Sequence, residues 1–350
     1  MSYATNKLIT SIEGPIMVTG HTGFKGTWLT LLLEQLGVPV VGYSLPANHK
    51  TLYQQLDRLG KIPEKLNDIN DITSIRIFMN EYKPSCIIHM AAQAIVLDSY
   101  KNPFQTFNTN VMGTVNLLTA AFDTDYVKSV VVVTTDKVYK NSGMSKFFKE
   151  NDSLEGKDPY SASKVGAEAA VAAWQKIASL SGGPKIFAVR AGNVIGGGDL
   201  ANDRLFPDIM RGLISNQSIQ IRNPKSTRPW QHVLDPIVGY LQALDAVLKG
   251  IEIKAINFGP SDESLTVEEI ITTGSSSWPI KPIFNLQAES NNLESQDLHL
   301  DSTYANSILK WKPHWSQPDS AKATIKWWDK VINKSVSPLN ACLDDISEIL

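Results

Sequence analysis

The sequence predicts an α/β fold, in which a doubly wound parallel sheet is followed by a smaller C-terminal region. In the first half of the chain, short apolar runs alternate with longer segments of helical periodicity. This alternation implies parallel strands covered by helices on both faces. After residue 193 the rhythm breaks up into stretches rich in Gly, Asp, Arg and Pro. We therefore expect a sheet domain over 1–193 and a second region over 194–350, with 235–260 returning to the sheet.

The expected elements follow from apolar patterning, read in chain order. Buried strands are predicted at 15–19, 38–43, 85–91, 130–135 and 185–193. Helices are predicted at 27–37, 72–82, 104–122 and 160–179. Beyond residue 193, only 254–260 has a strand pattern and 301–313 has an amphipathic helical pattern, whereas 274–300 is polar and predicts loops. The last fifteen residues show no motif, and no element is expected there.

Composition and charge narrow the class of partner. The chain has 350 residues, and its 33 basic residues nearly balance 35 acidic ones. This balance favours a small-molecule partner over nucleic acid or a membrane surface. Cys86 and Cys342 are too few for a disulfide framework or a zinc site, and no metal is expected. With neither a signal peptide nor a run of about 18 apolar residues, we expect a cytoplasmic protein.

A glycine-rich segment follows the first predicted strand and opens the first predicted helix. Its sequence is GHTGFKG, with Gly20, Gly23 and Gly26 spaced by three. Glycines let the backbone N–H groups at a helix N-terminus approach a pyrophosphate. The motif predicts a Rossmann-type dinucleotide-binding domain over 1–193, although a ligand-free turn would have the same composition. The cofactor contacts expected from this loop are Gly20, Thr22, Gly23, Phe24, Lys25 and Gly26.

The second strand does not indicate which dinucleotide binds. It ends at Tyr43, Ser44 and Leu45, without the carboxylate that would hold the adenosine ribose. Lys25 or Lys50 could meet a 2′-phosphate, and either could be an ordinary surface charge. The choice between NAD and NADP is open at this strand.

Tyr160 and Lys164 lie four residues apart at the start of an alanine-rich helical segment. Their spacing places both side chains on one helix face. A free tyrosine has a pKa of about 10, so it needs a positive neighbour to act as a base at neutral pH. Lys164 could be that neighbour, and Tyr160 could then take a proton from a hydroxyl group. A helix start with this spacing by chance is the alternative, and the glycine loop in the same chain argues against it.

The order of these motifs resembles a known family. The glycine loop, HMAAQAIVLDSYKNP, TTDKVY and Tyr160 to Lys164 together resemble the extended short-chain dehydrogenases/reductases, the NAD-dependent epimerases and dehydratases of nucleotide sugars. The resemblance covers about residues 14 to 315. It implies bound NAD, with NADP left open, and a nucleotide-sugar substrate. It also implies cofactor contacts from Asp68, Ile69, Ala91, Ala92, Gln93, Tyr160 and Lys164.

The residues after the fourth predicted core strand narrow the resemblance to dehydratases. Thr135 falls where the family hydrogen-bonds the reacting hydroxyl, and Asp136 where dehydratases carry an acid. Lys137 replaces the glutamate of many 4,6-dehydratases, and this resembles the branch that acts on CDP-glucose to supply deoxysugars for surface polysaccharides. The segments AGNVIGGGD, DRLFPD and IRNPKSTRPWQHVLDP resemble it too. A dehydratase or epimerase of a GDP-, dTDP- or UDP-sugar, and a silent dinucleotide-binding scaffold, remain as alternatives.

The resemblance assigns a role to each of these side chains. Tyr160, helped by Thr135 and Lys164, would deprotonate the C4 hydroxyl while hydride moves to NAD. Neutral Lys137 would then take the C5 proton, and protonated Asp136 would assist loss of the C6 hydroxyl. The alternative is a mutual ion pair in which Asp136 and Lys137 are both charged and inert.

Contacts to the substrate are expected from the second half of the chain. The resemblance places Arg228 at the nucleotide diphosphate, which suits a guanidinium. Asn193 and Arg204 are further candidates for the diphosphate or ribose, and each could instead be a surface residue. The helices at 104–122 and 160–179 occupy the positions of the dimer interface in relatives, so a homodimer is expected and a tetramer is open.

Overall fold

The computed structural model describes residues 8–47, 51–143, 146–202, 204–221, 223–261, 265–279, 283–286 and 298–350. Lys50 and most of the predicted loop segment after residue 279 lie outside these ranges.

The centre of the molecule is a seven-stranded sheet in which every neighbouring pair is parallel. Its strands are β1 (Ile16–Thr19), β2 (Val40–Ser44), β3 (Glu64–Leu66), β4 (Cys86–His89), β5 (Ser129–Val133), β7 (Lys185–Ala191) and β11 (Ala255–Phe258). Their order is β11-β7-β5-β4-β1-β2-β3. The predicted α/β fold class is confirmed. The order reverses between β1 and β4, and such sheets bind ligands beyond the carboxyl ends of the strands at that point.

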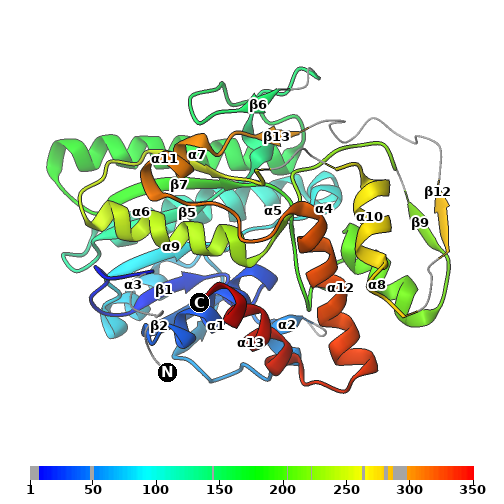
Figure 1. Ribbon diagram of the computed structural model, residues 1–350. Coiled ribbons are helices and arrows are strands. Elements are labelled where there is room, and N and C mark those ends of the chain that lie inside the picture. The colour runs from blue at the N-terminus through cyan, green and yellow to red at the C-terminus, as the bar shows by residue number, and fades with distance from the viewer. Residues whose placement is uncertain are drawn as a thin grey trace.

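Helices cover both faces of the sheet (Figure 1). One face packs on α3 (Ile72–Tyr82), α6 (Gly113–Phe122) and α7 (Pro159–Ser181), and the other on α1 (Phe24–Gln35) and α9 (Leu234–Leu248). In β5, Val130 and Val132 belong to the core on the α3, α6 and α7 side of the sheet. Val131 and Val133 belong to the core on the α1 and α9 side. A run of four valines therefore serves two cores, because successive side chains of a strand point to opposite faces.

The predicted helix at 104–122 is three consecutive helical pieces. These are α5 (Pro103–Phe107), a π-helical turn (Asn108–Met112) and α6. The helix α4 (Val96–Lys101) precedes them, and α2 (Leu52–Gln55) is a single turn between β2 and β3. The edge strand β3 was not predicted, because two of its three residues are charged and it has no apolar run.

The C-terminal region adds a second group of elements beside the sheet. In Figure 1 the helices α8 (Leu205–Ser215), α10 (Val267–Ser275) and α12 (Gln317–Asn333) lie together on the right, with α11 (Thr303–Leu309) above the sheet. Short parallel strand pairs connect the parts: β8 (Val194–Ile195) with β10 (Gln231–His232), β9 (Ile219–Ile221) with β12 (Phe284–Leu286), and β6 (Phe147–Phe148) with β13 (His299–Leu300). The expectation of a single strand after residue 193 was wrong, because two- and three-residue strands leave no recognisable period. The division of the chain at residue 193 stays a prediction.

The chain ends in a helix that was not predicted from the sequence. Helix α13 (Pro338–Ile349) starts at Pro338, and the preceding Ser337 caps it by accepting a hydrogen bond from the Asn340 N–H. It buries Cys342 and Ile346 in the core shared with α1 and α12. The pattern was missed because a buried Asp345 interrupts its apolar stripe.

Two negative findings apply to the described ranges. No helix there is long and apolar enough to cross a membrane. Nor does that part of the chain bring together three His, Cys, Asp or Glu side chains that could hold a metal ion.

Candidate active site

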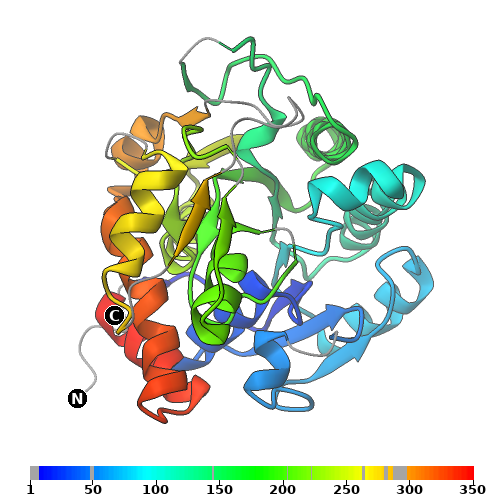
Figure 2. The same ribbon diagram turned by 90° about the vertical axis from the view of Figure 1, so that its right-hand side faces the viewer.

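A cavity of about 930 Å³ lies at the carboxyl edge of the sheet. Figure 2 looks onto the side of the molecule where the cyan α4 and α5 lie to the right and the yellow and orange α10 and α12 to the left. The predicted site residues that line the cavity are Gly20, Thr22, Gly23, Phe24, Lys25, Gly26, Asp68, Ile69, Ala91, Ala92, Thr135, Lys137, Tyr160, Lys164, Asn193, Arg204 and Arg228. One cavity thus receives side chains from both halves of the chain.

The glycine loop forms the turn between β1 and α1. Gly20 has φ of +74°, and a Cβ on Gly26 would lie 2.2 Å from the Gly20 carbonyl oxygen, so neither position accepts a side chain. Gly23 is the N-cap of α1 and provides no side chain to occupy the first N–H groups of the helix. These donors border the cavity, at the end of a helix dipole that favours an anion.

The ends of β2 and β3 form one end of the cavity. Tyr43, Ser44 and Leu45 line it together with Asp68 and Ile69. The Ser44 hydroxyl is hydrogen-bonded to the Thr22 hydroxyl at 2.8 Å. Asn67 lines the same end and was not predicted, because only the contact between β2 and β3 places it there.

Lys25 lies toward the Tyr160 end of the cavity. Its Nζ donates a hydrogen bond to the Tyr240 hydroxyl at 3.0 Å. Burial, together with the nearby charges of Arg204 and Lys164, lowers the pKa of Lys25 to about 7. These neighbours do not support a contact between Lys25 and a 2′-phosphate at the end of β2.

Tyr160 and Lys164 are fixed by the start of α7. Asp158 caps this helix in a reciprocal capping box with Ser161, so the helix begins at Pro159. The Lys164 ammonium donates to the Val133 carbonyl oxygen at 3.0 Å. Burial lowers the pKa of Lys164 to about 8, whereas the charge of Glu168 raises it. Burial also raises the pKa of Tyr160 to about 12, opposed by a hydrogen bond with Thr135.

Asp136 and Lys137 form the ion pair that the sequence left as an alternative. Lys137 Nζ lies 3.3 Å from Asp136 Oδ1 and donates to Asn193 Oδ1 at 3.1 Å. The Thr135 hydroxyl donates to the same Asp136 oxygen at 2.9 Å. Asp136 is fully buried, and its Oδ2 has no hydrogen-bond partner among the described residues. The Thr135 side chain therefore contacts both Tyr160 and Asp136.

The other end of the cavity carries the expected substrate residues. Arg228 is buried, and Arg204 forms an ion pair with Asp199 at 3.2 Å. Asp199, Asn223 and Ser226 also line the cavity; they were not predicted as site residues, although they lie within the segments AGNVIGGGD and IRNPKSTRPWQHVLDP.

Two predicted site residues do not line the cavity. Asp136 is fully buried next to the cavity-lining Lys137, and the Gln93 amide donates to the Ile95 carbonyl and to Asp98. Arg190, which precedes Asn193 by three residues, points away from the cavity toward Glu168 and Tyr139. The sequence could not separate these orientations, because they depend on which neighbouring strand or helix each side chain meets.

Comparison with known proteins identifies the family. The GDP-mannose 4,6 dehydratase family model matches residues 17–324. The CDP-glucose 4,6-dehydratase of Salmonella typhimurium is 41% identical over 321 residues, covering 89% of each chain. A dTDP-glucose 4,6-dehydratase structure from Streptomyces venezuelae, with NAD bound, has a TM-score of 0.79 at 23% identity and covers 93% of this chain and 99% of its own.

A Stenotrophomonas UDP-glucose 4-epimerase structure has a TM-score of 0.81 at 22% identity and covers 93% of this chain and 100% of its own. At this identity the likeness shows a shared fold. The family model and the Salmonella relative both extend over most of the chain, which confirms the resemblance seen in the sequence. The protein therefore belongs to the GDP-mannose 4,6 dehydratase family of NAD-dependent nucleotide-sugar dehydratases and epimerases.

Proposed function

We propose that this protein is a lyase that dehydrates CDP-D-glucose to CDP-4-keto-6-deoxy-D-glucose, with NAD as its cofactor. The observation that carries the proposal is one cavity lined by the glycine loop, by Thr135 and Lys137, and by Tyr160 and Lys164. A 41% identical relative named CDP-glucose 4,6-dehydratase supports the choice of substrate.

The glycine loop fits a dinucleotide pyrophosphate. Its glycines keep the backbone close to the cavity, and the start of α1 presents N–H groups toward it. When bound, NAD would accept a hydride from C4 of the sugar and return it to C6, so the net reaction is loss of water. Solved relatives named as NAD complexes favour NAD over NADP.

Tyr160, Thr135 and Lys164 would serve the first half of the reaction. Tyr160 takes the proton of the C4 hydroxyl, and the Thr135 hydroxyl holds both groups in line. Since burial raises the pKa of Tyr160, its phenolate needs the Lys164 ammonium and the positive charge of an oxidised nicotinamide.

Asp136 and Lys137 would serve the elimination. Moving one proton from Lys137 Nζ to Asp136 Oδ1, across 3.3 Å, converts the ion pair into a neutral amine and a carboxylic acid. The amine takes the C5 proton, and the acid protonates the departing C6 hydroxyl, which leaves as water. A low-dielectric site favours the neutral pair once substrate excludes solvent. Asp136 does not line the cavity, so its side chain must turn toward the sugar to deliver this proton.

The contacts of Thr135 also provide a path by which the protonation states of Tyr160 and Asp136 are restored after each turnover. At the end of the reaction Lys137 returns its proton to C5, while Tyr160 has gained a proton and Asp136 has lost one. The Thr135 hydroxyl contacts both Tyr160 and Asp136, so it can carry that proton between them.

A substrate panel tests the proposed activity. The protein is incubated with NAD and with CDP-, GDP-, UDP- and dTDP-linked sugars in turn; product masses report water loss, and chromatography of the released sugar reports inversion. Loss of one water from CDP-glucose, without stoichiometric reduction of NAD, is the expected result. Dehydration of another sugar alone, or inversion at C4 without water loss, would transfer the assignment to that activity. An unchanged mass with every substrate contradicts a lyase of this class, and the Tyr160→Phe variant is the inactive control.

We infer that the protein is a homodimer through α5, α6 and α7, with a tetramer as the alternative. Phe104 and Phe107 of α5, Met112 of the π-helical turn before α6, and Ile177 and Leu180 of α7 are exposed. Exposed apolar side chains on neighbouring helices favour a protein contact. Light scattering coupled to size exclusion gives the mass, and Phe104→Glu should shift it toward the monomer.

A further inference from the structure

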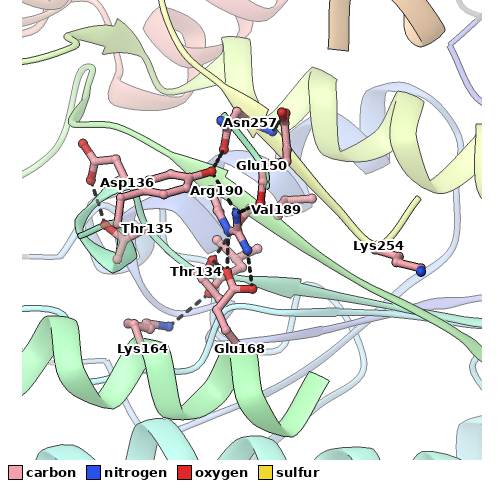
Figure 3. Close-up of polar contacts among 12 residues, drawn as sticks. Thr134, Thr135, Asp136, Glu150, Lys164, Glu168, Val189, Arg190, Lys254 and Asn257 are labelled. Atoms are coloured by element: carbon pink, nitrogen blue, oxygen red, sulfur yellow. Dashed lines mark hydrogen bonds and ion pairs between the residues drawn. The ribbon is translucent and has the colours of Figure 1, made fainter. Parts of the chain in front are cut away.

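A buried carboxylate lies behind the catalytic edge of the sheet, outside the cavity. Glu168 follows Lys164 by one turn of α7, and its side chain is 6% exposed. It accepts hydrogen bonds from Arg190 Nε at 2.8 Å, Arg190 Nη2 at 2.9 Å and the Thr134 hydroxyl at 2.6 Å (Figure 3). This bidentate ion pair thus connects α7 with β7 and with the end of β5.

Arg190 is itself held on its far side. Its Nη1 donates to the Tyr139 hydroxyl at 2.8 Å and to the Glu150 carbonyl oxygen at 3.0 Å. The Tyr139 hydroxyl in turn donates to Asn257 Oδ1 at 2.7 Å. A buried network whose members are all hydrogen-bonded is rigid. Its contacts with residues of several strands therefore fix the position of the Glu168 side chain.

Glu168 acts on both parts of the catalytic constellation, by a hydrogen bond from the Thr134 hydroxyl and by the effect of its charge on Lys164. Thr134 immediately precedes Thr135, whose hydroxyl is expected to align the reacting groups. Lys164 donates to the carbonyl of Val133, the residue before Thr134. The Glu168 charge also raises the pKa of Lys164 against the effect of burial. One carboxylate therefore influences both the position of the segment 133–135 and the charge of the Lys164 ammonium.

We propose that Glu168 is a positioning residue for the dehydration: through Thr134 it fixes the Thr135 hydroxyl beside Tyr160, and through its charge it holds the Lys164 ammonium. This inference rests on the proposed function. The competing reading is a buried ion pair that only stabilises the fold, and such pairs are weak evidence for any other role.

Two variants separate the charge of Glu168 from its hydrogen bond. Glu168→Gln keeps the shape and an acceptor oxygen but removes the charge. Thr134→Val removes only the hydroxyl donor and leaves the ion pair with Arg190 intact, and Thr134→Ser restores the donor. If Glu168→Gln does not fold, the Thr134 pair still tests the positioning role.

The two variants should have different kinetic signatures with CDP-glucose and NAD. Without the Glu168 charge, the pKa of Lys164 falls, so Lys164 loses its proton at lower pH. In Glu168→Gln the alkaline limb of the kcat profile should therefore move to lower pH, and kcat should fall tenfold or more. Thr134→Val should lower kcat by about tenfold with KM and the alkaline limb unchanged, and Thr134→Ser should recover most of it. The proposal is overturned if the folded variants have the wild-type kcat and the alkaline limb of their kcat profile lies at the wild-type pH.

A second readout does not depend on the substrate. The resonance of the Lys164 ammonium is assigned in ¹⁵N-lysine-labelled protein by its loss in Lys164→Met. Its chemical shift is then measured against pH, and the midpoint of this titration is compared between variants. The midpoint should be lower in Glu168→Gln and unchanged in Thr134→Val. If the substrate panel fails while this shift is found, only the reaction assignment is lost. If the midpoint does not move, the electrostatic part of the proposal is wrong.

The other ionisable groups near Lys164 define the controls. His89 of β4 stays neutral, because burial lowers its pKa to about 3. Lys25 of α1 changes charge in the same pH range, so the titration is repeated in Lys25→Met. Glu34→Gln is the matched ion-pair control, since Glu34 pairs with the buried Arg58 at 2.6 Å and neither residue lines the cavity. It should lower the unfolding midpoint while kcat and the Lys164 midpoint stay at the wild-type values.

Discussion

Replacing Asp136 by asparagine should separate the two halves of the proposed dehydration. The change removes one charge and almost no volume from a fully buried position. The asparagine Oδ1 can keep the contacts with Thr135 and Lys137, at 2.9 and 3.3 Å in the wild type. Its Nδ2 replaces an oxygen that has no hydrogen-bond partner among the described residues. We therefore expect the fold and the placement of Thr135 to be retained.

The expected effect on catalysis exceeds the expected effect on stability. Loss of a proton-transfer group slows its step by about 10² to 10⁴, which corresponds to about 3 to 5 kcal/mol on the activation barrier. The loss of the charge at the buried Asp136 lowers the free energy of unfolding by about 1 to 3 kcal/mol, because Lys137 is partly exposed and keeps access to solvent. Slow turnover of Asp136→Asn would therefore not reflect unfolding.

A single-turnover experiment measures the two halves separately. Excess Asp136→Asn, loaded with NAD, is mixed with CDP-glucose; cofactor absorbance reports oxidation at C4, and the product mass reports water loss. Oxidation should continue while water loss slows a hundredfold or more, so reduced cofactor accumulates. Asp245→Asn, which removes a carboxylate paired with Lys249 away from the cavity, should leave both rates unchanged.

Two results would refute the reasoning. Water loss at the wild-type rate means that Asp136 is not the acid of the elimination. Equal slowing of oxidation and water loss means that Asp136 acts by orienting Thr135 and not by transferring a proton.

Further predictions concern the cofactor end, the core and the substrate end. Burial, with nearby positive charges, lowers the pKa of Lys25 from 10.5 to about 7, so between these pH values the unfolded chain binds more protons and stability rises with pH. Lys25→Met should reduce this rise in urea unfolding of the ligand-free protein, and an equal rise contradicts the assignment. Gly197→Ala would place a Cβ 2.0 Å from the Trp327 ring. It should lower the free energy of unfolding by about 1 to 3 kcal/mol in denaturant titrations, and an unchanged midpoint would show that Trp327 can move. Arg228→Lys should weaken CDP binding about tenfold in calorimetry, because lysine lacks the bidentate fork, with NAD affinity unaltered; unchanged CDP affinity argues against a diphosphate contact.

Much of the fold was predictable because its elements carry local patterns. The helix predicted at 72–82 is α3, Ile72–Tyr82, and the core strands lie within one or two residues of the apolar runs. Helix α13 and strand β3 were missed for a shared reason. Each contains charged residues at positions where an apolar pattern was sought, and tertiary contacts supply the missing stabilisation.

The sequence by itself determined the fold class, the glycine loop and the Tyr160–Lys164 pair, because each depends on spacing along the chain. A helix turn brings residues four apart onto one face, and a parallel sheet brings strand ends to one edge. Only the tertiary structure decided that Lys137 contacts Asn193, 56 residues away, and that Glu168 binds Thr134 and Arg190, 34 and 22 residues away. Contacts between residues so distant depend on how strands and helices pack, and no local spacing encodes them.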